Sequence, residues 1–423
     1  MQNRLAAILL IIFISFPFNS SGQKLINSPI SRYNLGILEP AGSFRSIGMG
    51  GTGVAIRDKS SIYFSNPASY SSIDTNSFVF DFGLDYGFNI LSEDSSTYNS
   101  DDLNFDHLLM GFPIARRWGI ALGIVPLSNG YYNISETIPD DNMGTGEYIE
   151  YHNGNGSFTN FFIGSGINIT RNLSVGVNMT LLFGSIKRFN EFDFTKDFNV
   201  FNTVINEKLQ LTGIGVDLGL QYSAQLKNNY FLNAGASWSS GNKCKSQYES
   251  IAYRFNYYGI SDTLFSIVDD STKAYLPGTL RLGLSFGKNN KFTTGIDFLY
   301  TNWSNAKFHG SDGYVADTKA LLIGAEYIPD KFSNYSFLKR IEYRIGGHIE
   351  DNYLVLKGKQ VKEFGASIGF GIPMRRSMNK TNFFFDYTKK SWKGGDVVHI
   401  ENYFTMGLSL NMFDHWFIKR KYD

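Results

Sequence analysis

The feature that most constrains this chain is an alternation of apolar and small or polar residues that recurs from Phe78 almost to the C-terminal end. In 78–88, Phe, Leu and Tyr occupy the even positions, and the odd positions are mainly Asp and Gly. Successive side chains of a β-strand face opposite sides, so each such stretch predicts a strand with one apolar face. The same pattern returns in 173–183, 213–222, 280–286, 364–372 and 404–411.

A soluble β-sandwich would also alternate, and the consistent recurrence of the pattern, the lengths of the connections and the composition together favour a barrel in a membrane. The chain has 423 residues, 43 Gly and 16% aromatic residues, and no run of 18 apolar residues occurs beyond the N-terminus. Weak, distributed hydrophobicity with abundant aromatic and glycine residues is typical of transmembrane β-barrels. We therefore predict an all-β fold, an antiparallel transmembrane β-barrel.

A tilted strand needs about ten residues to cross a bilayer, and bacterial single-chain barrels have even strand numbers. On that basis we predict about 14 strands. They lie near 78–90, 101–114, 118–134, 157–170, 173–192, 205–226, 230–255, 276–288, 291–306, 318–330, 340–352, 359–373, 381–391 and 401–411.

The predicted connections alternate in length, which is typical of short periplasmic turns and longer outer loops. With an even strand number, both termini are then periplasmic. Two strands, 205–226 and 230–255, look longer than a membrane needs, and we expect their outer halves to project as a hairpin wall. The short connections are 115–117, 171–172, 227–229 and 287–290, followed on the same side by two somewhat longer ones, 329–339 and 373–380. The long connections are 91–100, 135–156, 191–203, 246–274 and 307–317.

The N-terminus predicts export. Residues 1–22 combine a basic start at Arg4, an apolar stretch and a small, polar end, which is the pattern of a signal peptide. The apolar part is short for a membrane anchor, and no cysteine follows it, as a lipoprotein would require. Cys244 is the only cysteine, so an internal disulfide is excluded. We divide the rest into a lead-in and hatch (23–77), the barrel (78–411) and a periplasmic tail with an aromatic girdle (412–423).

Residues 41–70 do not repeat, and we predict that they form a plug inside the barrel. Residues 48–53 also spell GxGxxG, but no apolar strand precedes them, so we disfavour a dinucleotide site. The glycines permit tight turns with positive φ, and an Asn-Pro-Ala sequence ends any regular element. The candidate hatch and ligand residues are Gly48, Gly50, Gly51, Gly53, Asn66, Pro67 and Ala68.

Five charged residues fall on the predicted lumen face: Asp81, Asp85, Asp217, Arg281 and Asp297. Charge on this face avoids hydrocarbon. We favour the interpretation that they hold the plug, by pairing with one another or with its backbone donors. Direct contact with a ligand is the alternative.

Several motifs resemble the FadL-type outer-membrane transporters, a family of 14-stranded barrels with an N-terminal hatch. They are Ser46–Ala55, Ser65–Ala68 with its Asn-Pro-Ala motif, Leu276–Gly283 and Thr301–Ser304. The sequences of Ser28–Tyr33 and Tyr343–Gly347 resemble those of family members from Bacteroidetes-type bacteria. In those bacteria a PorV-like branch of the family serves type IX protein secretion. The resemblance implies uptake of long-chain fatty acids or aromatic hydrocarbons. Residues 23–40 do not match the family's ligand-binding N-terminus residue by residue.

The sequence does not favour an enzyme. Its six histidines have no metal-ligand spacing, and no Gly-x-Ser-x-Gly motif occurs, although a Ser, His and Asp from distant strands can converge in a protease or lipase. We expect no cofactor and no metal. A net charge of +1 gives no support for nucleic-acid binding.

We therefore expect a monomer in the outer membrane of a Gram-negative bacterium. Its partners would be the lipid bilayer and a small hydrophobic ligand that passes the plugged barrel. The second hypothesis is a PorV-like barrel that binds secretion-system proteins. A general porin is a third, which the plug makes less attractive.

Overall fold

A computed structural model describes residues 28–93, 96–139, 147–194, 200–256, 258–259, 261–269, 273–309, 314–374, 377–394 and 397–415. The predicted signal peptide and the residues of the predicted aromatic girdle from 416 onward lie outside this description. Among the described residues, no helix is long and apolar enough to cross a membrane.

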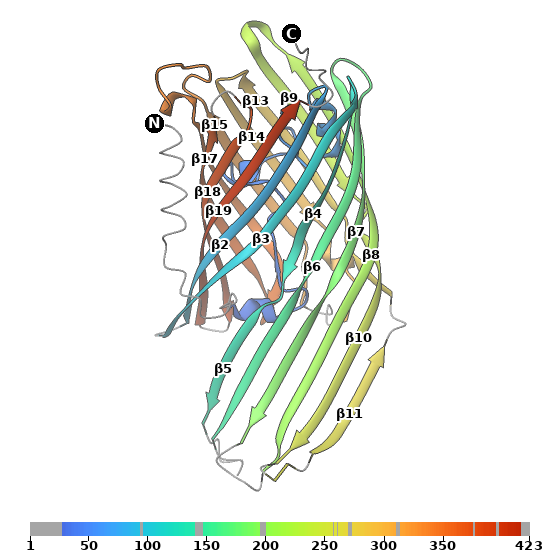
Figure 1. Ribbon diagram of the computed structural model, residues 1–423. Coiled ribbons are helices and arrows are strands. Elements are labelled where there is room, and N and C mark those ends of the chain that lie inside the picture. The colour runs from blue at the N-terminus through green and yellow to red at the C-terminus, as the bar shows by residue number, and fades with distance from the viewer. Residues whose placement is uncertain are drawn as a thin grey trace, which may run out of the picture.

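The chain folds into a closed antiparallel barrel of 14 strands, as predicted (Figure 1). The last strand closes the ring by pairing with the first, from Ser77 opposite His415 to Ser92 opposite Ile400. The barrel strands are β2 (Ser77–Glu93), β3 (Ser96–Ala115), β4 (Trp118–Asn129), β6 (Tyr148–Asn168), β7 (Leu173–Asp193), β8 (Asn202–Gln225), β9 (Tyr230–Ser239), β13 (Thr279–Lys288), β14 (Phe292–Thr301), β15 (Thr318–Tyr327), β16 (Glu342–Leu356), β17 (Lys359–Pro373), β18 (Lys380–Gly394) and β19 (Val397–His415).

The alternation in the sequence becomes the two faces of the wall. Leu282 and Leu284 on β13 are 46% and 53% exposed, whereas Gly283 between them is buried. An outward apolar band facing lipid and an inward face of small residues are what a membrane barrel requires. Burial in this molecule therefore lies inside the ring.

Four strands extend the sheet beyond the ring of fourteen, and β1 of the interior is the nineteenth. Strands β6, β7 and β8 run on past the barrel, where β5 (Tyr132–Ile138) pairs with β6 and β10 (Asn242–Phe255) pairs with β8. β11 (Ser261–Asp269) and β12 (Lys273–Leu276) both pair with β10. Figure 1 shows β5, β10 and β11 projecting beyond one end of the barrel. We call this part the extension.

The structure corrects four sequence predictions, three of them in the extension. The predicted strand 118–134 is broken between β4 and β5, and 230–255 is broken at Gly241, whose φ of +71° turns the chain from the barrel into the extension. The predicted loop 246–274 contains β11, β12 and much of β10. The predicted loop 91–100 is a short hairpin connection, because β2 and β3 continue to Glu93 and Ser96.

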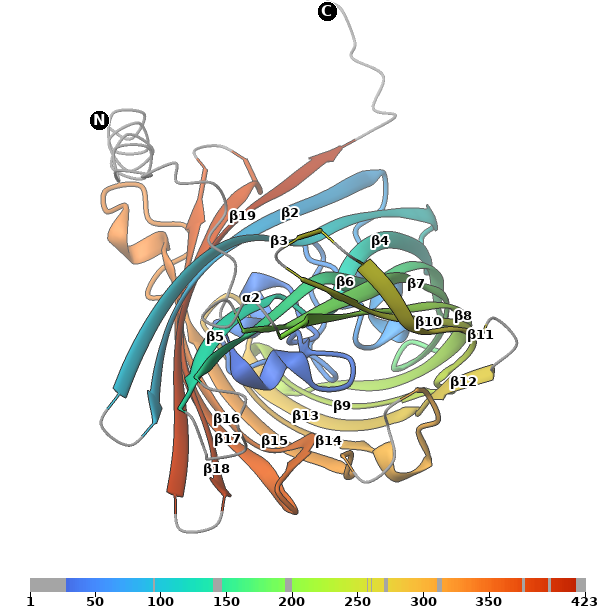
Figure 2. The same cartoon turned by 90° about the horizontal axis from the view of Figure 1, so that it is seen from below.

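Residues 28–73 lie inside the barrel, and we call them the inner segment (Figure 2). Their short elements are η1 (Pro29–Arg32), β1 (Ile37–Leu38), α2 (Phe44–Ile47) and η2 (Pro67–Ser72); η3 (Lys227–Asn229), η4 (Trp303–Asn305) and η5 (Leu338–Arg340) lie in connections. β1 pairs with β4, α2 packs against β17 to β19, and η2 packs against β6 to β8. The segment thus touches opposite walls.

Glycine lets the backbone of the inner segment approach the wall. Gly50 and Gly51 have positive φ, as predicted, but Gly48 and Gly53 do not. Gly48 instead ends α2 in the right-handed region and faces Gly369 of β17. A Cβ on Gly50 would lie 2.5 Å from the Gly347 nitrogen and 2.6 Å from the Ile323 oxygen. Two backbones meet there with no room for a methyl group.

We expect Gly50→Ala to destabilise the protein by more than about 4 kcal/mol, because strain at positive φ adds to the clash with the wall. Gly358→Ala is the matched control: its φ is +74°, and nothing lies within 4 Å of a Cβ there. It should cost only about 1–2 kcal/mol. Thermal unfolding in detergent measures both, and equal losses would contradict the close approach.

Candidate functional site: a cavity between the inner segment and the wall

Asn66 ties the inner segment to the barrel. Its side chain is fully buried, and its Oδ1 accepts from the Ala68 N–H, which caps η2. Its Nδ2 donates to the Val54 carbonyl (2.8 Å) and to the carbonyls of Leu220 on β8 (3.2 Å) and Ala236 on β9 (3.3 Å). Pro67 fits the first position of η2, where an N–H would have no partner. The Asn-Pro-Ala sequence therefore both starts a helix and fastens it to two strands.

The stretch 53–56 is held by side chains of the wall instead of by a neighbouring strand. Asp297 on β14 accepts from the N–H groups of Gly53 (2.7 Å) and Val54 (2.9 Å). Ser285 on β13 donates to the Ala55 carbonyl, and Gln221 on β8 donates to that of Val54. A buried backbone needs such partners, and this wall supplies them.

A buried cluster of six charges fixes the inner segment at the end of the barrel that has the short turns. Glu326 on β15 accepts from Arg45 (2.7 Å) and from Arg344 on β16 (2.7 Å), and Arg45 also pairs with Asp58 (2.6 Å). Glu342 pairs with Arg344 and with Lys380 (2.6 Å). Burial alone would raise the pKa of Asp58, but Arg45 and Lys380 outweigh it and hold the pKa well below its usual range. Three cations thus balance three carboxylates.

We expect Arg45→Met to cost about 3–5 kcal/mol, because it leaves the carboxylates of Asp58 and Glu326 buried with one partner fewer. Hydrogen exchange of residues 44–58 should rise, and the melting temperature should fall. Lys362→Met is the control, since Lys362 pairs with Asp351 at 4.0 Å on the exposed surface. An exchange rate at 44–58 that matches the control would contradict the role of the cluster.

The five predicted lumen charges all point inward but have different neighbours. Asp81 contacts His107 (3.3 Å) and Asn411 (3.3 Å) in a buried group, and Asp297 binds the inner segment. Asp85, Asp217 and Arg281 line a cavity, as does Asp297. The structure therefore separates Asp81 from the other four.

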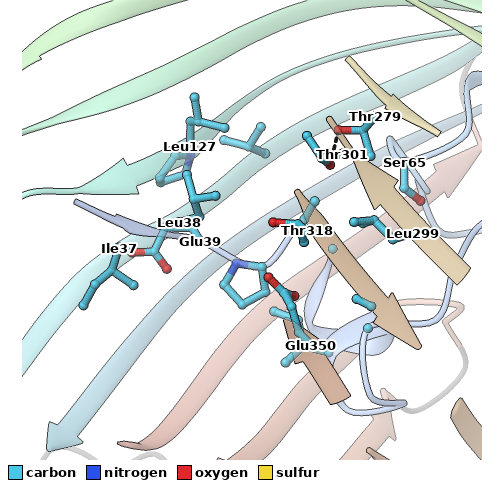
Figure 3. A pocket seen from close by; sticks show the side chains of 18 of the residues that line it. Ile37, Leu38, Glu39, Ser65, Leu127, Thr279, Leu299, Thr301, Thr318 and Glu350 are labelled. Carbon is cyan, nitrogen blue, oxygen red and sulfur yellow. Dashed lines mark hydrogen bonds between the residues drawn. The ribbon is translucent and has the colours of Figure 1, made fainter. Parts of the chain in front are cut away.

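That cavity has a volume of about 420 Å³ and lies between the inner segment and the wall. Figure 3 shows Ile37 and Leu38 of the inner segment together with Leu127 near the end of β4, and Leu299 with Thr279 and Thr301 on another side. An apolar pocket with a few polar groups is the usual form of a small-molecule site. Gly50 and Gly51 also line it, whereas Asn66, Pro67 and Ala68 do not.

One side of the cavity is acidic. Six carboxyl groups line it from five strands and the inner segment: Glu39, Asp85 (β2), Asp106 (β3), Glu350 (β16), Glu363 (β17) and Asp386 (β18). Lys390 lies 3.3 Å and His348 3.3 Å from Glu363. Burial, with help from Asp106, raises the pKa of Glu39 to about 7 against the opposing effect of Lys390.

Glu39 should make the stability depend on pH. Its pKa is above the value of 4.5 that it has in the unfolded chain, so ionisation costs the folded state progressively as the pH rises from about 4.5 through 7. Glu39→Gln should therefore match the wild type near pH 4 and melt at a higher temperature at pH 8. A melting-temperature difference that is the same at both pH values would contradict this linkage.

The chain matches a protein-family model, described as BamG, over residues 4–423. The chain belongs to the BamG family. No curated protein is similar enough in sequence to count as a relative.

Solved structures match this BamG-family chain in fold. A Pseudomonas aeruginosa FadL homologue is 14% identical with a TM-score of 0.62, covering 90% of this chain and 99% of its own. The CymD monoaromatic hydrocarbon channel is 16% identical with a TM-score of 0.59, covering 90% and 100%. The Ralstonia pickettii toluene transporter TbuX is 15% identical with a TM-score of 0.57, covering 88% and 99%. The expected FadL-type barrel is thus confirmed as a fold.

Proposed function

We propose that the protein is an outer-membrane channel that takes up small hydrophobic molecules, with the inner segment as its plug and the cavity as its binding site. The observation that carries the proposal is the cavity of about 420 Å³ beside the inner segment, with Ile37, Leu38, Leu127 and Leu299 on its lining. A volume of this size fits a small apolar ligand. The ligands named for the fold neighbours, monoaromatic hydrocarbons and toluene, belong to the same class.

In this proposal the chain does no covalent chemistry. A ligand enters from the side of the long connections, rests against the apolar lining, and leaves when contacts of the inner segment open. We place the short turns, and with them the C-terminal end of β19, in the periplasm. The first described residues lie at the other end of the barrel, where Ser28 contacts Glu401 and Tyr403, so a periplasmic N-terminus requires residues 1–27 to lead back to that side. We also propose a monomer from a Bacteroidetes-type bacterium. Long-chain fatty acids remain candidate ligands alongside aromatic hydrocarbons.

We expect Leu127→Trp to reduce uptake of toluene by at least about tenfold, because the larger side chain fills the cavity. Leu284→Trp, on the outward face and 53% exposed, is the matched control. Uptake into liposomes and native mass spectrometry of the purified barrel are the two measurements. Unchanged uptake and binding in Leu127→Trp would contradict the proposed site.

A second candidate is a barrel that binds partner proteins of the secretion-system class, and the extension is the observation that favours it. Leu264, Phe265, Ile267 and Val268 on β11 are 42–66% exposed. In the described part of the chain, β11 pairs only with β10, so its other edge is open. An open apolar edge is a template for pairing with another chain. Loss of a co-purifying protein on Ile267→Asp, with toluene uptake unchanged, would favour this function.

A further inference from the structure

The carboxyl groups of the cavity exceed its cations. Glu363 contacts Lys390 and His348, and Asp106 contacts His107. For Glu39, Asp85 and Glu350, no cation of the described residues lies within salt-bridge distance. Charges gathered in one cleft focus their field on whatever enters it. The acidic side of the cavity therefore presents more carboxyl groups than cations to a ligand.

Two buried polar side chains on the same cavity also have no partner. Asn89 on β2 is 5% exposed, and neither its Nδ2 nor its Oδ1 makes a hydrogen bond. Thr318 on β15 is 4% exposed, and its hydroxyl likewise makes none (Figure 3). A buried polar group without a partner costs about 1–3 kcal/mol, so a ligand that bonds with it recovers that cost. These groups are independent of the carboxyl groups and also point to a polar ligand group.

The apolar side of the cavity lies next to this polar side. Ile37 and Leu38 directly precede Glu39 in the inner segment. Figure 3 shows Glu39 beside Leu38 and Leu127, with Glu350 on a separate side of the space. A ligand lying along the leucines would therefore have its end near carboxyl groups.

We propose that this cavity selects amines: small molecules that join an apolar chain to an ammonium group, in preference to carboxylates of the same length. The proposal rests on the proposed function, because it assigns the ligand class of that cavity. An ammonium group gains attraction and hydrogen-bond acceptors at the acidic side. A carboxylate there loses water and meets like charge, and such repulsion is an effective way to exclude a ligand.

The test compares n-octylamine, n-octanol and n-octanoate, which share a chain and differ in the polar end. Isothermal titration of each into the full-length barrel in non-ionic detergent at pH 7.5 gives three affinities. We expect octylamine to bind at least about tenfold more tightly than octanoate, with octanol between them. Octanoate binding as tightly as octylamine would overturn the proposal.

Variants of the cavity carboxyl groups test whether these groups cause the preference for octylamine. Glu350→Gln and Glu39→Gln should each reduce the preference for octylamine over octanol several-fold, about 1 kcal/mol, and leave octanol binding unchanged. Octanol binding also shows that each variant is folded, and one variant suffices if the other does not fold. Asp351→Asn is the matched control, since Asp351 follows Glu350 but its side chain is 43% exposed. An equal loss in Asp351→Asn would overturn the assignment to the cavity.

The outcomes separate the two proposals. If octanol and toluene bind but octylamine binds no better than octanol, the selectivity proposal fails and the channel proposal stands. If none of the four compounds binds, the channel proposal fails and the selectivity proposal fails with it.

Discussion

A backbone enclosed in a barrel must find a hydrogen-bond partner for each buried N–H and carbonyl group, and this constraint shapes the whole interior. The inner segment has only one turn of α-helix, two short 3₁₀-helices and a two-residue strand, so its own secondary structure satisfies few of these groups. Side chains of the wall take over, with Asp297, Gln221 and Ser285 reaching the stretch 53–56. Asn66 does the same in reverse, reaching from the segment to carbonyl groups of the wall. The many glycines on the inward face make these short distances possible.

Two groups of charged side chains lie in the interior, the cluster around Arg45 and the carboxyl groups of the cavity. At the end with the short turns, Arg45, Arg344 and Lys380 balance three carboxylates, and the inner segment is closed against the wall. In the cavity, carboxyl groups outnumber cations, and the space stays open. Where cations and carboxylates balance, the inner segment is closed against the wall. Where carboxyl groups exceed cations, a cavity remains between them. Under the proposed selectivity, the charge of a ligand is part of what the cavity recognises.

The sequence predicted the wall well because a period of two is a local signal. The strand number follows from it, and so does the inward direction of Asp85, Asp217 and Asp297. The pairing of 205–226 with 230–255 beyond the barrel was predicted and is seen between β8 and β10. The breaks after β4 and at Gly241 and the strands β11 and β12 were missed, because they interrupt or replace the alternation that the prediction used. The candidate site was harder to predict from the sequence than the wall. Glu342, Arg344 and Glu350 share one face of β16, so the alternation identifies them as lumen residues. No local pattern shows that Arg344 meets Glu326, the partner of Arg45, while Glu350 lines the cavity.

β8 belongs to two parts of the molecule at once. Its C-terminal half pairs with β9 in the barrel, and its N-terminal half pairs with β10 in the extension. The strand is 24 residues long, which corresponds to on the order of 80 Å. One end reaches the tip of the extension, and near the other the Leu220 carbonyl accepts from Asn66. One uninterrupted strand therefore joins the tip of the extension to the place where Asn66 fastens the inner segment. A force on the extension would be transmitted along β8 to that anchor.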